Sequence, residues 1–154
     1  MRSALLAAIA AIFLLSMLDH TGLVTQIASK TVVSSAHGDS SLGLDDSEVV
    51  RAQKSKLSDV QVLGAAKVTR ILSDDLKGSR HQRFILGLSS GGTILVAHNI
   101  DLAARIPDIA VGDTVEFYGE YEWNVKGGVV HWTHHDPARR HVDGWLVHRG
   151  SKYQ

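Results

Sequence analysis

The chain has 154 residues, of which 44% are apolar and 21% are charged, so it is long enough for one globular domain and too apolar to stay disordered. Its 16 basic residues balance its 16 acidic residues, and this zero net charge argues against strong nucleic-acid binding. The chain has no cysteine, which excludes disulfides, thiolate metal sites and a cysteine nucleophile. Histidine is the unusual residue, because seven of the nine histidines lie between His81 and His148.

The chain begins with an apolar run. Residues 3–18 carry no charge and follow a single basic residue, Arg2, as in a secretory signal. The run is shorter than the roughly 20 residues of a spanning helix, but the small-residue cleavage pattern at 34–36 lies far from it. We therefore expect residues 1–18 to form a signal peptide or an uncleaved signal-anchor. The protein is then exported, either periplasmic or anchored facing the periplasm, and it meets the membrane only through an uncleaved N-terminal segment.

Two short segments precede the main domain. Residues 19–46 are rich in Ser, Thr, Gly and Asp without a sustained period, which predicts a linker. Residues 47–59 are expected to form a short helix that Asp46 or Ser47 can cap, since apolar residues recur there at helical spacing. From residue 60 to residue 154 the pattern changes to strands and turns, which predicts a β-barrel domain with a histidine-rich C-terminal extension.

Alternation of apolar and polar residues predicts the strands of this domain, over residues 60–72, 84–88, 93–98, 114–124 and 129–133. Between the third and fourth strands, Asn99 can cap a short helix from Ile100 to Ile106, which Pro107 ends. This order is that of an OB-fold, a five-stranded Greek-key barrel. The fold class is therefore mainly β, an OB-like barrel with a short helix between strands 3 and 4, preceded by an N-terminal signal or anchor helix. An SH3-like barrel is the main alternative, and the helix argues against it.

The tail from His134 to Gln154 exceeds what a minimal barrel needs, and we expect it to pack across one rim. Four histidines in and before this tail are candidate ligands of a divalent, zinc-type metal ion: His131, His135, His141 and His148. Asp136 is then an oxygen ligand or an acceptor that orients an imidazole. The spacing matches no standard zinc motif. A metal-free ligand pocket and a purely structural role for the histidines remain alternatives.

A second cluster follows a glycine turn before the second strand. Arg80, His81 and Arg83 could clamp a phosphate or carboxylate group, since a guanidinium forms bidentate contacts with such anions. The alternative is a solvated strand start whose arginines pair with Asp74 and Asp75. The sequence leaves the two interpretations equally open.

Further candidates lie on the later strands. His98 and Asn99 are expected to contact a ligand where the third strand ends, although Asn99 also suits a helix cap. Glu120 shares a strand face with Glu122 and is a candidate general acid or base, against the simpler interpretation of a solvated glutamate. The tryptophans are ambiguous: Trp123 is expected in the core, whereas Trp132 and Trp145 either cover the core or stack on a ligand.

Four segments resemble a family of small exported bacterial proteins classed as a domain of unknown function: residues 78–84 (GSRHQRF), 97–103 (AHNIDLA), 119–124 (GEYEWN) and 131–137 (HWTHHDP). The resemblance covers roughly residues 62–154. It implies an exported bacterial domain and no particular reaction. Because it centres on the same polar and aromatic clusters, it favours a shared site over incidental surface.

Two functions follow from these residues. The first is a binding module for a small or oligomeric ligand, with Trp132, Trp145 and Tyr118 as stacking surfaces and arginines as anion contacts. The second is a metal-dependent hydrolase, similar to a phosphodiesterase or nuclease, in which His134, His135 or a bound metal activates water. Both require the imidazoles to meet on one side of the barrel.

Overall fold

The computed structural model describes residues 45–154, and the expected signal segment and most of the expected linker lie outside these residues. The described part contains one helix and seven strands: α1 (Ser47–Lys54), β1 (Val60–Ile71), β2 (His81–Gly87), β3 (Thr93–Asn99), β4 (Thr114–Glu122), β5 (Val129–His131), β6 (Trp145–His148) and β7 (Ser151–Tyr153). Within these residues no helix is long and apolar enough to cross a membrane.

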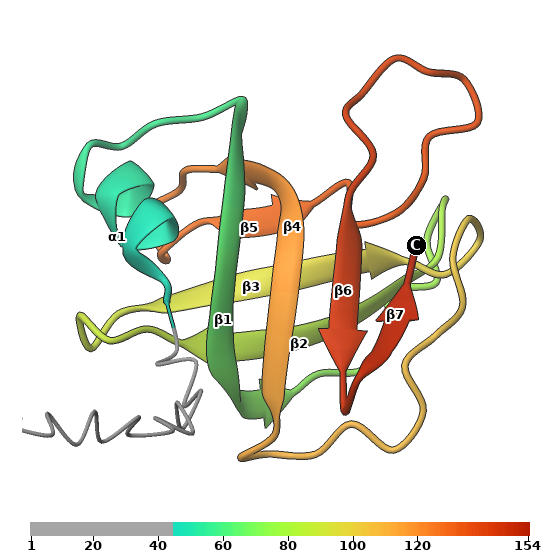
Figure 1. Ribbon diagram of the computed structural model, residues 1–154, viewed down its shortest axis with the longest axis horizontal. Coiled ribbons are helices and arrows are strands. Elements are labelled where there is room, and N and C mark those ends of the chain that lie inside the picture. The colour runs from blue at the N-terminus through green and yellow to red at the C-terminus, as the bar shows by residue number, and fades with distance from the viewer. Residues whose placement is uncertain (1–44) are drawn as a thin grey trace, which may run out of the picture. The chain divides into compact units, whose positions relative to one another are not determined.

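Five of the strands close into a barrel (Figure 1). They follow the order β1-β2-β3-β5-β4, and β1 closes the barrel because it pairs with β2 on one side and with β4 on the other. The pairing of β3 with β5 is parallel, while the other barrel pairings are antiparallel. This closed sheet confirms the predicted OB-like barrel. The register of β1 shifts between Val68 and Arg70, where the long strand passes from one partner to the other.

The core fills the barrel as the alternation predicts. Every second residue of β2, β3 and β4 is buried, so that one face of each strand lines the interior. The largest buried side chains are Tyr121, Phe84, Phe117, Leu86 and Ile94. The outward residues of the same strands are therefore fixed as well, and they carry the polar groups of the site.

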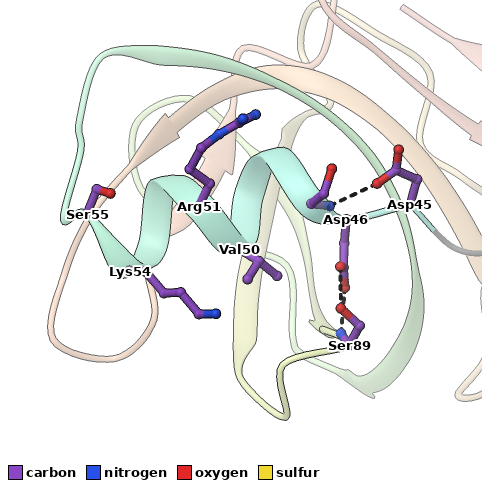
Figure 2. A pocket seen from close by; sticks show the side chains of 8 residues that line it. Asp45, Asp46, Val50, Arg51, Lys54, Ser55 and Ser89 are labelled. Carbon is purple, nitrogen blue, oxygen red and sulfur yellow. Dashed lines mark hydrogen bonds between the residues drawn. The ribbon is translucent and has the colours of Figure 1, made fainter.

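The helix α1 closes one end of the barrel. Its residues Val49 and Ala52 belong to the buried core, and Gln53 donates from Nε2 to the carbonyl oxygens of Thr93 and Gly127, at the ends of two hairpins. Asp46 occupies the N-cap position as predicted, but its side chain makes no capping bond, because its carboxylate accepts from Ser89 of the β2–β3 turn (Figure 2). The Ser47 N–H donates to Asp45 instead. The helix ends at Lys54, whereas the sequence predicted it over residues 47–59.

The helix expected between the third and fourth strands is not formed. Residues 100–113 are turns and irregular segments, so the prediction of a helix from Ile100 to Ile106 was wrong, whereas the other predicted short helix is formed as α1. The reason lies in β2: the buried amide of Gln82 donates to the Ile106 carbonyl and accepts from the Ile106 N–H. These bonds, and the burial of the Ile106 side chain, hold the backbone in a non-helical path.

The C-terminal tail also differs from the expectation that it packs across a rim. Strands β6 and β7 form a hairpin, and β6 pairs with the first half of β4, so the tail extends the sheet beside the barrel. The segment between β5 and β6, residues 132–144, is a loop that projects beyond the end of β6 (Figure 1); we call it the 132–144 loop.

Candidate functional site

Two glutamates and a histidine meet on the outer face of β4 and β5. Glu120 pairs with His131 across the antiparallel strands, so the two side chains leave the sheet on the same face. Glu122 is the next outward residue of β4, and one ligand atom from each of the three residues lies within 4.8 Å of the others. The period-two pattern of the strands therefore creates the first part of the site.

The 132–144 loop brings a second imidazole to Glu120. His141 Nδ1 lies 3.6 Å from Oε2 of Glu120, and His131 Nε2 lies 3.6 Å from Oε1. Both separations are longer than a hydrogen bond, whose N···O distance reaches about 3.2 Å. Two imidazoles thus flank the two oxygens of one carboxylate without bonding to it. We call Glu120, Glu122, His131 and His141 the outer cluster.

His131 carries a buried nitrogen without a partner. Its Nε2 is shielded from solvent and makes no hydrogen bond within residues 45–154. The same holds for Oε1 of Gln61, a residue of β1 that lies opposite Glu120 of β4 in the sheet. Burial lowers the pKa of His131, against the opposing effect of Glu120 and Glu122. The neutral imidazole that results has a lone pair available to a ligand.

The loop that carries His141 is organised by Asp136. Its buried carboxylate accepts hydrogen bonds from the backbone N–H groups of Ala138, Arg140 and His141. These bonds oppose the effect of desolvation and hold the pKa of Asp136 below its ordinary value. The role expected for Asp136 as an acceptor that orients an imidazole is therefore performed through the backbone of His141, not through its ring.

The indole of Trp132 holds the His141 ring from the other side. The two rings are stacked, with centroids 3.5 Å apart and planes 18° from parallel. Trp132 reaches this position with a backbone φ of 49°, in the left-handed region that a bulky residue rarely adopts. The conformation turns the chain out of β5 and lays the indole over the imidazole. Trp132 therefore covers part of the site and not the core.

A small hollow adjoins the outer cluster on the β2–β3 side, and we call it the imidazole hollow. It is lined by Ser79, His81, Ala97, Asn99, His131, Trp132 and His134. No aspartate or glutamate lines it. Four of the residues predicted to take part in ligand binding or catalysis therefore meet in one place: His81, Asn99, Trp132 and His134. The hollow shares His131 with the outer cluster, and Trp132, which stacks on His141, lines it as well.

His98 lies beneath this hollow in the core. It is fully buried, its Nδ1 is 2.9 Å from the Thr133 hydroxyl, and its Nε2 is 3.2 Å from the Ala104 carbonyl. Because a carbonyl only accepts, Nε2 carries the proton and Nδ1 accepts from Thr133. Burial lowers the pKa of His98 to about 4. The structure thus separates His98 from the ligand-facing residues with which the sequence grouped it.

The remaining candidates lie elsewhere. His135 is exposed and bonded to Asp143, and His148 is bonded to Asp113 beside the start of β4. Of the four predicted histidine ligands, only His131 and His141 lie together, at Glu120. Arg80 pairs with Asp101, with 2.6 Å between nitrogen and oxygen. Arg83 donates to the Ser73 carbonyl and forms an ion pair with Asp75. The ring of Trp145 lies against that of Tyr118, with centroids 6.2 Å apart and the planes tilted.

A larger hollow beside α1 is lined by Asp45, Asp46, Ser47, Val50, Arg51, Lys54, Ser55 and Ser89 (Figure 2). No residue selected from the sequence as a ligand or catalytic group lines it. Its two carboxylates already accept hydrogen bonds from Ser47 and Ser89, which anchor the helix. The carboxylates that line this hollow therefore attach α1 to the barrel.

Some contributions were missed by the sequence reasoning. Glu122 was noted beside Glu120 but not selected as a ligand, although their shared strand face carried the signal. Asp143 was not selected either, yet it accepts from both the Asp136 N–H and His135 and thereby draws His135 away from the outer cluster. Only the folded loop reveals which histidine Asp143 engages.

The fold and the outer cluster together define a small OB-like barrel domain with histidines and carboxylates gathered on one outer face. The chain belongs to the family described as "Protein of unknown function (DUF3465)", which matches residues 31–154. The match begins well before residue 62, where the resemblance begins, and so includes α1. Neither the curated proteins nor the solved structures contain a match to this chain.

Proposed function

We propose that this protein is a binding module whose outer cluster holds one divalent transition-metal ion of the zinc type. The observation that carries the proposal is the meeting of Glu120, Glu122 and His131, one ligand atom of each of which lies within 4.8 Å of the others, with His141 Nδ1 3.6 Å from the second oxygen of Glu120. With metal–ligand bonds of about 2.1 Å, tetrahedral coordination separates neighbouring ligand atoms by about 3.4 Å. The spacing therefore suits atoms that share an ion better than atoms that bond to each other.

Charge and accessibility support the same proposal. The carboxylates of Glu120 and Glu122 give the site a negative charge that a divalent cation balances. The buried, unpartnered Nε2 of His131 is otherwise a desolvated polar atom, which folded proteins avoid. Imidazole nitrogens favour zinc, copper or nickel over calcium or magnesium, which prefer oxygen ligands.

The proposal extends to where the protein acts. We propose that it is exported, because residues 3–18 follow Arg2 as an uncharged apolar run. A site built from histidine and glutamate side chains suits an oxidising compartment, since it contains no thiolate that could be lost to a disulfide.

Titration of the untagged, EDTA-treated full chain with Zn²⁺ tests this function. Calorimetry is expected to give one bound ion per chain, and no comparable binding of Mg²⁺ or Ca²⁺. Glu120→Gln, His131→Gln and His141→Gln are each expected to weaken zinc binding by at least about tenfold. His135→Gln is the matched control, because His135 lies on the same loop but is bonded to Asp143. Zinc binding that is absent, or that survives all three cluster substitutions, contradicts the proposal and leaves the cluster as surface ion pairs.

Asp136→Asn tests whether the loop delivers His141. The substitution places an amide NH₂ against backbone donors that now meet a carboxylate, so the loop loses the bonds that fix His141. We expect zinc affinity to fall by about 10- to 100-fold, as for other residues that orient a metal ligand. Calorimetry measures the affinity, and circular dichroism checks that the barrel persists.

Asp74→Asn is the control for this experiment, because Asp74 pairs with Arg105 outside the cluster. It is expected to bind zinc as the unmodified chain does. An Asp136→Asn protein that is folded and keeps full zinc affinity contradicts the role assigned to the loop.

A further inference from the structure

The imidazole hollow offers hydrogen-bonding groups that the metal proposal does not use. Ser79, His81, Asn99 and His134 line it, and none of its lining residues is acidic. Its volume of about 180 Å³ is smaller than the roughly 300–1,000 Å³ of pockets that hold drug-sized ligands. A ligand of that size is a small ion and not a nucleotide or an oligosaccharide.

In two of these side chains, Asn99 and His134, one polar atom is already hydrogen-bonded within the protein. That bond determines which polar atom is left for a ligand. Asn99 Oδ1 accepts from the Asp101 N–H at 2.9 Å, so the NH₂ group is the end left for a ligand. His134 Nδ1 lies 2.7 Å from the His135 carbonyl oxygen, and because a carbonyl only accepts, Nδ1 carries the proton. Nε2 is then the ring nitrogen left for a ligand, and it makes no hydrogen bond within residues 45–154.

The hollow therefore combines donors with an acceptor. Asn99 and the Ser79 hydroxyl can donate to oxygens of an anion, while His134 Nε2 can accept a hydrogen bond from an O–H group of the anion. Hydrogen phosphate has both unprotonated oxygens and an O–H group near neutral pH, whereas sulfate has no proton to donate. An acceptor at a fixed place favours the ion with the O–H, because an ion without it leaves the acceptor unpaired.

We propose that the imidazole hollow binds a small protonated tetrahedral oxyanion of the hydrogen-phosphate class and discriminates against sulfate. The inference does not require a metal ion. The hollow is lined by residues at or beside β2, β3 and β5 and by the 132–144 loop, and His131 is the one residue that it shares with the outer cluster.

The test uses inorganic phosphate and sulfate, titrated separately into the EDTA-treated full chain at neutral pH and constant ionic strength. Calorimetry and the amide NH₂ signal of Asn99 report binding. We expect saturable phosphate binding and at least about tenfold weaker sulfate binding. Absent phosphate binding overturns the proposal, and so does equal binding of the two ions, which would identify general attraction of anions.

Asn99→Asp supplies the matched variant. The aspartate can still accept from the Asp101 N–H, so the turn is kept while the donor becomes a charge that repels an anion. Phosphate affinity is expected to fall by at least about tenfold. The control is Asn124→Asp, since Asn124 accepts from the N–H groups of Lys126 and Gly128 in the β4–β5 turn and does not line the hollow. Unchanged phosphate affinity in Asn99→Asp overturns the proposal.

The same proteins separate this inference from the metal proposal. Asn99 does not belong to the outer cluster, so Asn99→Asp is expected to keep its zinc affinity while it loses phosphate. Zinc binding without phosphate binding in the unmodified chain rejects the oxyanion site alone. Phosphate binding without zinc binding rejects the metal site alone.

Discussion

Gly144→Ala is expected to destabilise the protein by roughly 3 kcal/mol or more. A Cβ at this position would overlap the carbonyl oxygens of Trp132 and Tyr118 and press on Thr133. All of these are backbone atoms, and the Gly144 N–H is itself bonded to the His134 carbonyl, so no side chain can move aside to relieve the overlap. To relieve the overlap, the two ends of the 132–144 loop must move away from each other and from β4. The loop that carries His141 then loses its attachment to the barrel. Urea denaturation followed by tryptophan fluorescence measures the loss.

Gly78→Ala is the control for this experiment. The position has a φ of 67°, but a Cβ there would meet nothing within 4 Å. Its expected cost is only that of placing alanine in the left-handed region, about 1 kcal/mol. If the two variants are equally stable, the close approach of the loop to β4 is not what Gly144 provides.

Acid is expected to remove about 3 kcal/mol of stability between pH 6.5 and pH 4 through His98. Burial lowers the pKa of His98 from 6.5 to about 4 in the folded protein, whereas the unfolded chain takes up the proton near 6.5. Below pH 6.5 the unfolded state therefore binds more protons than the folded state. The contribution of His98 is complete above pH 6.5 and is lost as the pH falls toward 4.

The free energy of unfolding, measured in urea across this pH range, checks the prediction. His98→Gln is expected to show a shallower loss in acid than the unmodified chain, while the exposed His135→Gln keeps the full loss. A direct measurement avoids any dependence on how the variant folds: the imidazole signals of His98 in the unmodified protein should stay those of a neutral ring at pH 5. A ring that is protonated at pH 5 would falsify the assignment.

The barrel could be predicted from the sequence because its strands are amphipathic. In β4, Val115, Phe117 and Tyr121 alternate with outward polar residues, and this pattern fixes both the strand and its buried face. The segment after β3 could not be predicted in the same way. Its path depends on the side chain of Gln82, some 24 residues earlier, and no local pattern reports that contact.

The candidate site likewise has a part that the sequence predicts, on the strands, and a part that it does not predict, in the loop. That Glu120 and His131 lie on neighbouring strands follows from the hairpin, although their register depends on the geometry of the intervening turn. His141 joins them because Asp136 folds the loop through backbone bonds, and His135 does not because Asp143 binds it. From sequence spacing alone, His135 and His141 are equally good candidate ligands. The difference between them arises from contacts made within the loop.

The two imidazoles of the outer cluster are held in different ways, one by a strand and the other by a loop. His131 is held by a hydrogen-bonded strand of a closed barrel, which cannot shift its register without opening the whole sheet, whereas His141 is attached to a loop outside the barrel strands that the carboxylate of Asp136 organises. An ion captured by the strand residues would meet a preformed partial shell that the loop then completes. The residence time of the ion would accordingly be set by the opening rate of the loop and not by the stability of the barrel.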